Sequence, residues 1–241
     1  MKLSFNPIKV LGKTLLVVGL TSALGGASLY AQTIYTLGGL VNTGGSITID
    51  DKTFSNFGWR SANATLSADA AALVVTASSS GGVDYLNWSG VIAVDNTAGT
   101  GSSLGDLTLT YTVTANPGLI NMIDQAYTPL QATVPASGQI IIGETVANNG
   151  IIVANSTLTL NPPDLSDPPA EPGDNLNINP SVNQLAVIKD ITILANAGNV
   201  VGLNNVEQSF HQVPEPSTML LGSLGGGLLL LLNSRRRVKR D

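Results

Sequence analysis

The residues best suited to nucleophilic chemistry are a serine motif and the single histidine. Residues 101–105 read Gly-Ser-Ser-Leu-Gly, which fits the pattern G-x-S-x-G, and His211 lies downstream. In hydrolases this motif needs a strand before it and a helix after it. Here a Gly-Thr-Gly turn precedes it and a strand-like sequence follows from Leu107. A polar hairpin loop explains the motif, and a hydrolase is a remote alternative.

The acidic residues show no pattern typical of a metal site. Asp50 and Asp51 are adjacent, so on a strand they point to opposite faces, and we expect both to be solvated. The segment 161–180 is rich in proline and contains Asp164, Asp167, Glu171 and Asp174. Their spacing matches no calcium loop, and the prolines oppose strand pairing, so we expect an exposed loop or spacer. The sequence predicts no catalytic residue, no cofactor and no metal ligand.

The charges divide the chain into a basic start, an acidic body and a basic end. Of the 11 Lys and Arg residues, only Lys52, Arg60 and Lys189 lie in the body, while most of the 16 acidic residues do. Such a body is not expected to bind nucleic acid or an anionic lipid surface. The chain has no cysteine, which excludes disulfides, thiol nucleophiles and zinc–thiolate sites.

Three different pieces follow one another at the C-terminal end. First comes a proline-rich joint, made of Val213, Pro214, Glu215, Pro216, Ser217 and Thr218. An uncharged apolar run follows at 219–232. A basic cluster closes the series, made of Arg235, Arg236, Arg237, Lys239 and Arg240. An apolar run followed by Arg and Lys predicts a transmembrane helix with its basic end in the cytoplasm, although 14 residues are fewer than the roughly 17–25 that span comfortably.

This order resembles the PEP-CTERM sorting signal of Gram-negative bacteria, over residues 213–240. The motif is also labelled an ice-binding protein C-terminal domain in some family descriptions. The resemblance implies an exosortase partner at the inner membrane, which recognises the Pro-Glu-Pro region of the substrate. It also implies a membrane-anchored precursor that is processed and then delivered to the cell surface or the extracellular space.

The first 31 residues predict a secretory signal peptide. Lys2, Lys9 and Lys13 precede a short apolar stretch at 15–20, and small residues follow. Cleavage is expected after Ala31 or after Ala27. The Sec export machinery is therefore a second expected partner, and residues 32–212 form the exported domain.

The body predicts an all-β fold, an antiparallel β-sandwich that is jelly-roll-like. Short runs rich in Val, Ile, Thr and aromatic residues alternate with Gly, Asn, Asp and Ser. The clearest strand is 107–114, where apolar residues alternate with threonine. The other candidate strands are 46–49, 53–59, 73–77, 91–94, 139–142, 151–154, 157–160, 185–188, 191–195 and 206–210. A parallel β-helix is the second choice, but no fixed repeat supports it.

The stretch from Lys52 to Phe57 reads Lys-Thr-Phe-Ser-Asn-Phe, and it resembles an early element of PEP-CTERM ectodomains. Phe54 and Phe57 are expected in the core near a strand bend. Sugar binding through Trp59, Trp88 or Tyr85 is a weaker alternative, because aromatic residues make up only 5% of the chain.

Two classes of function remain open from the sequence. The first is a non-enzymatic surface or extracellular-matrix protein that is associated with exopolysaccharide. The second is an extracellular binding module for carbohydrate or ice. A row of threonines (Thr108, Thr110, Thr112 and Thr114) would suit an ice-binding face, but such a face should repeat the row on neighbouring strands, where only Thr157 and Thr159 offer a short echo.

Overall fold

The structure is a computed structural model that describes residues 34–62, 66, 69–130, 137–161 and 175–212. The predicted signal peptide, the sorting signal with its apolar run 219–232, and residues 162–174 of the predicted loop lie outside the described residues. The helical elements are α1 (Leu37–Thr43) and the 3-10 helix η1 (Ala70–Ala72). The strands are β1 (Tyr35–Thr36), β2 (Ile47–Ile49), β3 (Lys52–Ser61), β4 (Val74–Ser80), β5 (Val83–Asp95), β6 (Ser103–Ala115), β7 (Ile120–Pro129), β8 (Gly138–Asn148), β9 (Ile151–Leu160), β10 (Leu176–Val182), β11 (Gln184–Ala195) and β12 (Val200–Gln212).

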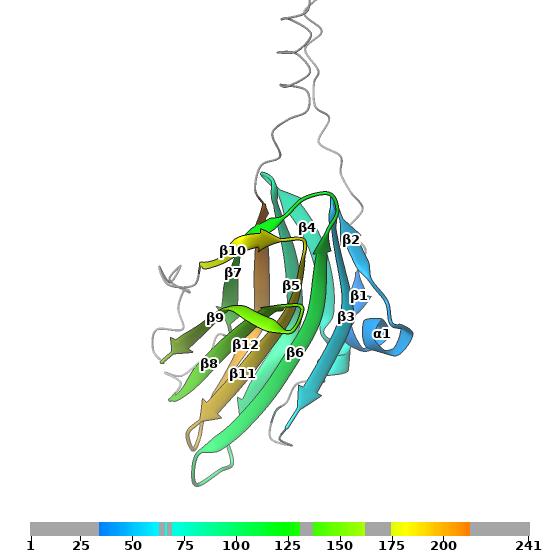
Figure 1. Cartoon of the computed structure of the whole chain (residues 1–241). Coiled ribbons are helices and arrows are strands. Elements are labelled where there is room, and N and C mark those ends of the chain that lie inside the picture. The colour runs from blue at the N-terminus through cyan, green and yellow to red at the C-terminus, as the bar shows by residue number, and fades with distance from the viewer. Residues whose placement is uncertain (1–33, 63–65, 67–68, 131–136, 162–174, 213–241) are drawn as a thin grey trace, which may run out of the picture. The chain divides into compact units, whose positions relative to one another are not determined.

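These strands form two sheets that lie face to face (Figure 1). Sheet A has the order β1-β4-β5-β12-β7-β10, and sheet B has the order β2-β3-β6-β11-β8-β9. Every strand pairing is antiparallel among the described residues. The predicted antiparallel β-sandwich is confirmed, and the parallel β-helix is excluded.

The last eight strands are nested in the manner of a jelly roll. β8 pairs with β9, β7 with β10, β6 with β11, and β5 with β12. This arrangement is a long two-stranded ribbon whose successive pairs alternate between the two sheets. β12 consequently lies in the middle of sheet A, between β5 and β7.

The core is an aromatic cluster that joins the two sheets. Tyr111, at the centre of β6, lies with its ring centroid 5.2 Å from Trp88 and 6.3 Å from Phe210, both of sheet A. Phe54 of sheet B packs 5.2 Å from Phe210, and Phe57 stacks on Tyr111. All five rings are buried. They lie within a larger interior of Leu, Ile and Val side chains contributed by both sheets.

A bulge in β3 explains how Phe54 and Phe57 can both face inward although they are three residues apart. The register between β3 and β6 shifts between Ser55 and Gly58. Asn56 takes a positive φ of 52° there, and its Nδ2 donates to Thr112. An extra residue in one strand changes which face the following side chains occupy, so both rings enter the core.

A short helix, α1, covers part of the core beside β3 (Figure 1). Thr36 caps its start by accepting from the backbone N–H of Gly39, and Gly44 ends it in the left-handed conformation. At Gly38 a Cβ atom would lie 2.9 Å from Ala71 of η1, so glycine permits the close contact between the two helical turns. Two glycines inside a seven-residue helix oppose helix formation, and tertiary packing is what holds it.

The structure extends several predicted strands and adds three that the sequence pattern did not reveal, β1, β7 and β10. The runs 151–154 and 157–160 are one strand, as are 185–188 and 191–195. β7 was not predicted because Gln125 occupies an inward position between Ile123 and Tyr127 and breaks the apolar alternation.

The predicted loop 161–180 was wrong at its C-terminal end, where β10 begins at Leu176. Leu176 and Ile178 alternate inward and are buried, which favours a strand despite Pro180. β10 is the edge strand of sheet A, and an edge position tolerates a residue that lacks a backbone donor.

A pair of substitutions at Tyr111 separates the contribution of its ring from that of its hydroxyl group. The hydroxyl is buried and has no hydrogen-bond partner among the described residues. We therefore expect Tyr111→Phe to change the free energy of unfolding by less than about 1 kcal/mol, whereas Tyr111→Ala should cost about 3–5 kcal/mol through the cavity that it leaves. Urea denaturation of both variants measures this. A large loss of unfolding free energy in Tyr111→Phe would contradict the view that Tyr111 stabilises the fold through its ring.

Candidate functional site

Two lysines are buried inside the sandwich, which is unusual for a charged side chain. Lys52, the first residue of β3, and Lys189, in the middle of β11, both have an exposed fraction of 0%. Each has acidic or amide groups around its ammonium nitrogen. A buried charge is tolerated only where such partners compensate its loss of water.

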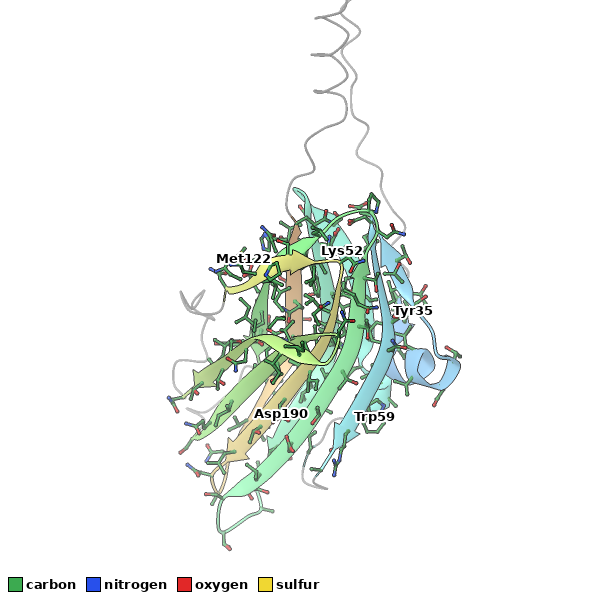
Figure 2. All side chains as sticks on the ribbon, in the orientation of Figure 1. Tyr35, Lys52, Trp59, Met122 and Asp190 are labelled. Atoms are coloured by element: carbon green, nitrogen blue, oxygen red, sulfur yellow. The ribbon has the colours of Figure 1, made fainter. Side chains whose placement is uncertain are left out.

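The Lys52 cluster consists of Asp51, Lys52, Asp84 and Gln212. Nζ of Lys52 lies 2.6 Å from Oδ2 of Asp84 and 3.2 Å from Oδ1 of Asp51. Asp84, the second residue of β5, is only 3% exposed. The contact with Asp84 therefore joins sheet B to sheet A at one end of the sandwich. Figure 2 shows Lys52 and Trp59 at opposite ends of β3.

Gln212 connects this cluster to the end of the described domain. Its Nε2 donates a hydrogen bond to Oδ1 of Asp51. The turn between β6 and β7 closes over the same place, since the backbone N–H of Asn116 donates to the carbonyl of Asp51. A Cβ atom on Gly118, whose φ is +123°, would lie 2.8 Å from Oδ2 of Asp51. Glycine is therefore required there both for its φ and for the close approach.

The expectation that Asp50 and Asp51 are both solvated was wrong for Asp51. The two residues form the turn between β2 and β3, with Asp50 exposed at a φ of 47°. Asp51 is partly buried, because the turn directs its side chain toward Lys52 and Gln212.

The Lys189 cluster, formed by Gln125, Glu144 and Lys189, lies deeper between the sheets. Nζ of Lys189 donates to Oε1 of Gln125 at 2.7 Å, which links β11 of sheet B to β7 of sheet A. Oε1 of Glu144, opposite Lys189 on β8, lies 3.6 Å from the same nitrogen. Burial and, second, the carboxylate of Glu144 raise the pKa of Tyr111 well above its usual value.

His211 lies with Asp124 and Ser209 on sheet A. Its Nε2 is 2.8 Å from Oδ2 of Asp124 and 3.3 Å from the hydroxyl oxygen of Ser209. The Ser209 hydroxyl also donates to Asp124. A catalytic triad needs one ring nitrogen toward the serine and the other toward the acid, whereas here both partners contact Nε2. The geometry is that of a surface hydrogen-bond cluster.

The serine motif at 101–105 does not have the surroundings that a hydrolase needs. Ser103 opens β6, so a strand follows the motif rather than a helix. The hydroxyl of Ser102 donates to Asn196. At Gly105 a Cβ atom would lie 2.5 Å from Val94, so this glycine serves packing.

The threonine row of β6 lies on the outer face of sheet B, and it continues to neighbouring strands only in part. Thr114 is in register with Thr53, and Thr53 with Thr48. On the other side, β11 places Ala186, Ile188 and Asp190 opposite the row. β11 and β8 also separate β6 from the Thr157 and Thr159 strand, β9.

Hydrogen bonds to neighbouring side chains engage several hydroxyls of this row. Thr108 donates to Asp190, and Thr114 accepts from Gln184. Thr48 and Thr53 bond to each other. The row therefore has a local role in joining adjacent strands.

The three aromatic residues considered for sugar binding do not come together. Trp88 is 1% exposed and belongs to the core. Trp59, 41% exposed, lies near the end of β3 in sheet B, whereas Tyr85 lies on β5 in sheet A. The three side chains cannot form one stacking surface.

Two carboxylates, Asp106 and Asp190, face each other on the outside of sheet B (Asp190 is labelled in Figure 2). Burial and then the Asp190 charge raise the pKa of Asp106, while Arg60 acts in the opposite sense. In the part of the chain that the structure describes, no group of three or more His, Asp or Glu side chains is placed to hold a metal ion.

The predicted sorting residues (213–218 and 235–240) and both candidate cleavage sites, Ala31 and Ala27, lie outside the described residues. Among the described residues, no helix is long and apolar enough to cross a membrane.

The fold places the described domain in the class of all-β proteins built as an antiparallel jelly-roll sandwich. The family described as the PEP-CTERM protein-sorting motif matches residues 212–237. The chain therefore carries a PEP-CTERM sorting signal at this position, and this signal implies export and a membrane-anchored precursor. The match begins at Gln212, the last residue of β12.

A comparison with curated protein sequences finds no match. Among solved structures, the chain is similar to TmCBM61, which was determined in complex with beta-1,4-galactotriose. The identity is 11%, the alignment covers 62% of this chain and 86% of that chain, and the TM-score is 0.27.

Sequence reasoning missed both buried lysines, although a signal for each was present. Lys189 stands at an inward position of an alternating strand, between Val187 and Ile191. Lys52 has the same relation to Phe54. The sequence alternation could have predicted that both lysine side chains point into the core. It could not have predicted that their partners lie on β5 and β7.

The Asp106–Asp190 pair predicts a pH-dependent gain in stability from Asp106→Asn. Because the folded-state pKa of Asp106 is raised, its ionisation disfavours the fold, and this penalty appears as the pH rises through that pKa. We expect the substitution to stabilise the protein by about 0.5 kcal/mol at neutral pH, where it removes a like-charge contact. Below the ordinary pKa of aspartate, the gain should vanish.

Thermal unfolding at pH 7 and pH 3 measures the difference between the two proteins. Asp95→Asn is the matched control, because hydrogen bonds from Thr97 lower the pKa of Asp95. This substitution should lower the stability at neutral pH, whereas Asp106→Asn should raise it. Equal stability of Asp106→Asn and the parent protein at both pH values would contradict the account.

Proposed function

We propose that this chain is a non-enzymatic surface or extracellular-matrix protein, exported through the Sec machinery and processed by an exosortase. The observation that carries the proposal is the position of the domain boundary. β12 is a central strand of sheet A, and it ends at the residue where the sorting motif begins. Cleavage at or near Pro214-Glu215-Pro216 would leave every described strand in place.

The way β12 ends supports the same proposal. Gln212 is hydrogen-bonded to Asp51, and His211 to Asp124, so the last two residues of β12 are held by the domain. The hydrogen bonds of β12 to β5 and β7 continue almost to this point. The released product would therefore need no residue of the sorting signal for its stability.

Association with exopolysaccharide is the finer part of the proposal. The acidic body favours solubility and repels acidic polysaccharide, so contact with such a polymer would need bridging divalent cations. A neutral polymer would meet the threonine-bearing outer face of sheet B, where hydroxyl groups are accompanied by few charges, Asp106, Asp190 and Arg60 among them. The alternative function, a binding module for carbohydrate or ice, is tested below by glycan-binding and ice-recrystallisation assays.

Replacement of Pro214, Glu215 and Pro216 by alanine tests the processing step. We expect the variant to remain in the inner membrane with its basic tail intact, whereas the parent protein reaches the surface or the medium. The matched control is Pro180→Ala, which changes a proline of edge strand β10 and should leave sorting unaffected. Cell fractionation followed by mass spectrometry gives the result.

Equal release of the variant and the parent protein would contradict exosortase processing at this motif. The surface form can then be tested against a glycan panel and for inhibition of ice recrystallisation. Both assays should be negative for a structural matrix protein. A positive result in either would move the domain into the second class.

A further inference from the structure

We propose that Lys52 and Asp84 become joined by an amide bond between their side chains, which forms a covalent link between the two sheets. The link would be a post-folding modification of the exported domain. It goes beyond the proposed function, because neither the sorting motif nor the matrix role requires it. It rests on the contact distance, the burial and the second carboxylate of the Lys52 cluster.

The two reacting groups are already in contact. Nζ of Lys52 lies 2.6 Å from Oδ2 of Asp84, in a place where Lys52 is fully buried and Asp84 is 3% exposed. Groups held at such a distance by a rigid scaffold react as if present at very high concentration. Asp84 is directly opposite Phe210 in the register of β5 and β12, and the ring of Phe210 packs against that of Phe54. Aromatic rings therefore lie next to the ion pair.

The ion pair leaves polar atoms without hydrogen bonds. Oδ1 of Asp84 and Oδ2 of Asp51 are both buried and have no hydrogen-bond partner among the described residues. An unpartnered oxygen of a carboxylate is costly in this position, because it carries charge. Conversion of Asp84 into an amide removes the charge from both Lys52 and Asp84 at once.

The reaction is a condensation that needs no oxidant, reductant or external group. A proton passes from the Lys52 ammonium to the Asp84 carboxylate, which gives a neutral amine and a carboxylic acid. The nitrogen lone pair then attacks Cγ of Asp84, and an N–C bond forms. The C–O bond to the hydroxyl oxygen breaks after this oxygen is protonated, so one water leaves and one nitrogen proton is lost with it.

Asp51 is positioned to carry the proton between these steps. Its Oδ1 lies 3.2 Å from Nζ of Lys52, and Gln212 donates to the same oxygen. A carboxylate there can accept a proton from the attacking nitrogen and return it to the departing oxygen. The side chain of Asp51 is 18% exposed, which gives the leaving water a short way out.

The Lys189 cluster provides an internal comparison. Lys189 is equally buried, but Oε1 of Glu144 lies 3.6 Å from its Nζ, and Oε1 of the Gln125 amide lies 2.7 Å from the same nitrogen. Glu144 lies on β8, the neighbour of β11 in the same sheet. The geometry therefore assigns the amide bond to Lys52 and not to Lys189.

Trypsin digestion of the full chain, purified and denatured, tests the bond. Trypsin cuts after Lys and Arg, and between positions 14 and 234 these are Lys52, Arg60 and Lys189, so an unlinked chain releases the peptide 53–60. A chain linked through Lys52 is not cut after that residue. Its N-terminal piece, ending at Arg60, stays attached to the peptide 61–189, and the joined mass is lower by one water. Cleavage after Lys189 should be normal.

Two variants assign the roles. Asp51→Asn should slow the appearance of the joined peptide by about a hundredfold, a typical loss when a proton-carrying group is removed. The double variant Lys52→Met/Asp84→Leu should show the same circular dichroism as the parent protein and form no link. Both substitutions keep approximate side-chain volume, so the fold is expected to persist.

Release of peptide 53–60 from the parent protein, purified in its folded form and then denatured, with no loss of water, would overturn the proposal and leave an ion pair. A loss of one water that persists in the double variant would overturn the assignment to this pair. Equal rates in Asp51→Asn and the parent protein would overturn the role given to Asp51. None of these results would bear on sorting, which depends on residues 213–218.

Discussion

Contact between the two sheets across the aromatic cluster is the interaction on which the remaining structure depends. Tyr111 of sheet B meets Trp88 and Phe210 of sheet A, and the β3 bulge adds both Phe54 and Phe57 to the same cluster. The chain has no cysteine, so this packing and the hydrogen bonds of the sheets are the main means of holding an exported domain together. The nested pairing of β5 through β12 brings residues far apart in sequence into that interior.

The buried polar groups are arranged around this interior and connect the sheets in a directional way. Lys189 reaches Gln125 across the middle of the sandwich, and Lys52 reaches Asp84 at its end. Apolar packing alone permits small shifts of one sheet over the other, whereas a buried ion pair has one favourable geometry. The Lys52 cluster also includes Gln212, the last residue of β12. Its hydrogen bond to Asp51 fixes the end of the domain at the point where the sorting signal starts.

The sequence predicted the fold class because the strand signal is strong where inward positions are uniformly apolar, as in β6. Polar inward residues weakened the strand signal elsewhere: Gln125 concealed β7, and Asp84 stands in the part of β5 that the pattern did not reveal. These polar residues are the partners of the buried lysines, so the same residues that disrupted the pattern form the clusters. The sorting signal was recognisable from sequence because it is a local order of residue types, whereas the clusters depend on pairing across distant strands.

The intact mass of the protein recovered from the cell surface and the medium tests the central claim, that the sandwich is delivered by its C-terminal signal. The account predicts a species that begins after Ala31 or Ala27 and ends within residues 213–216. A protein that still carries Arg235 to Arg240 and is found only in the inner membrane would contradict it. Such a result would leave a domain that is anchored by its tail and never sorted.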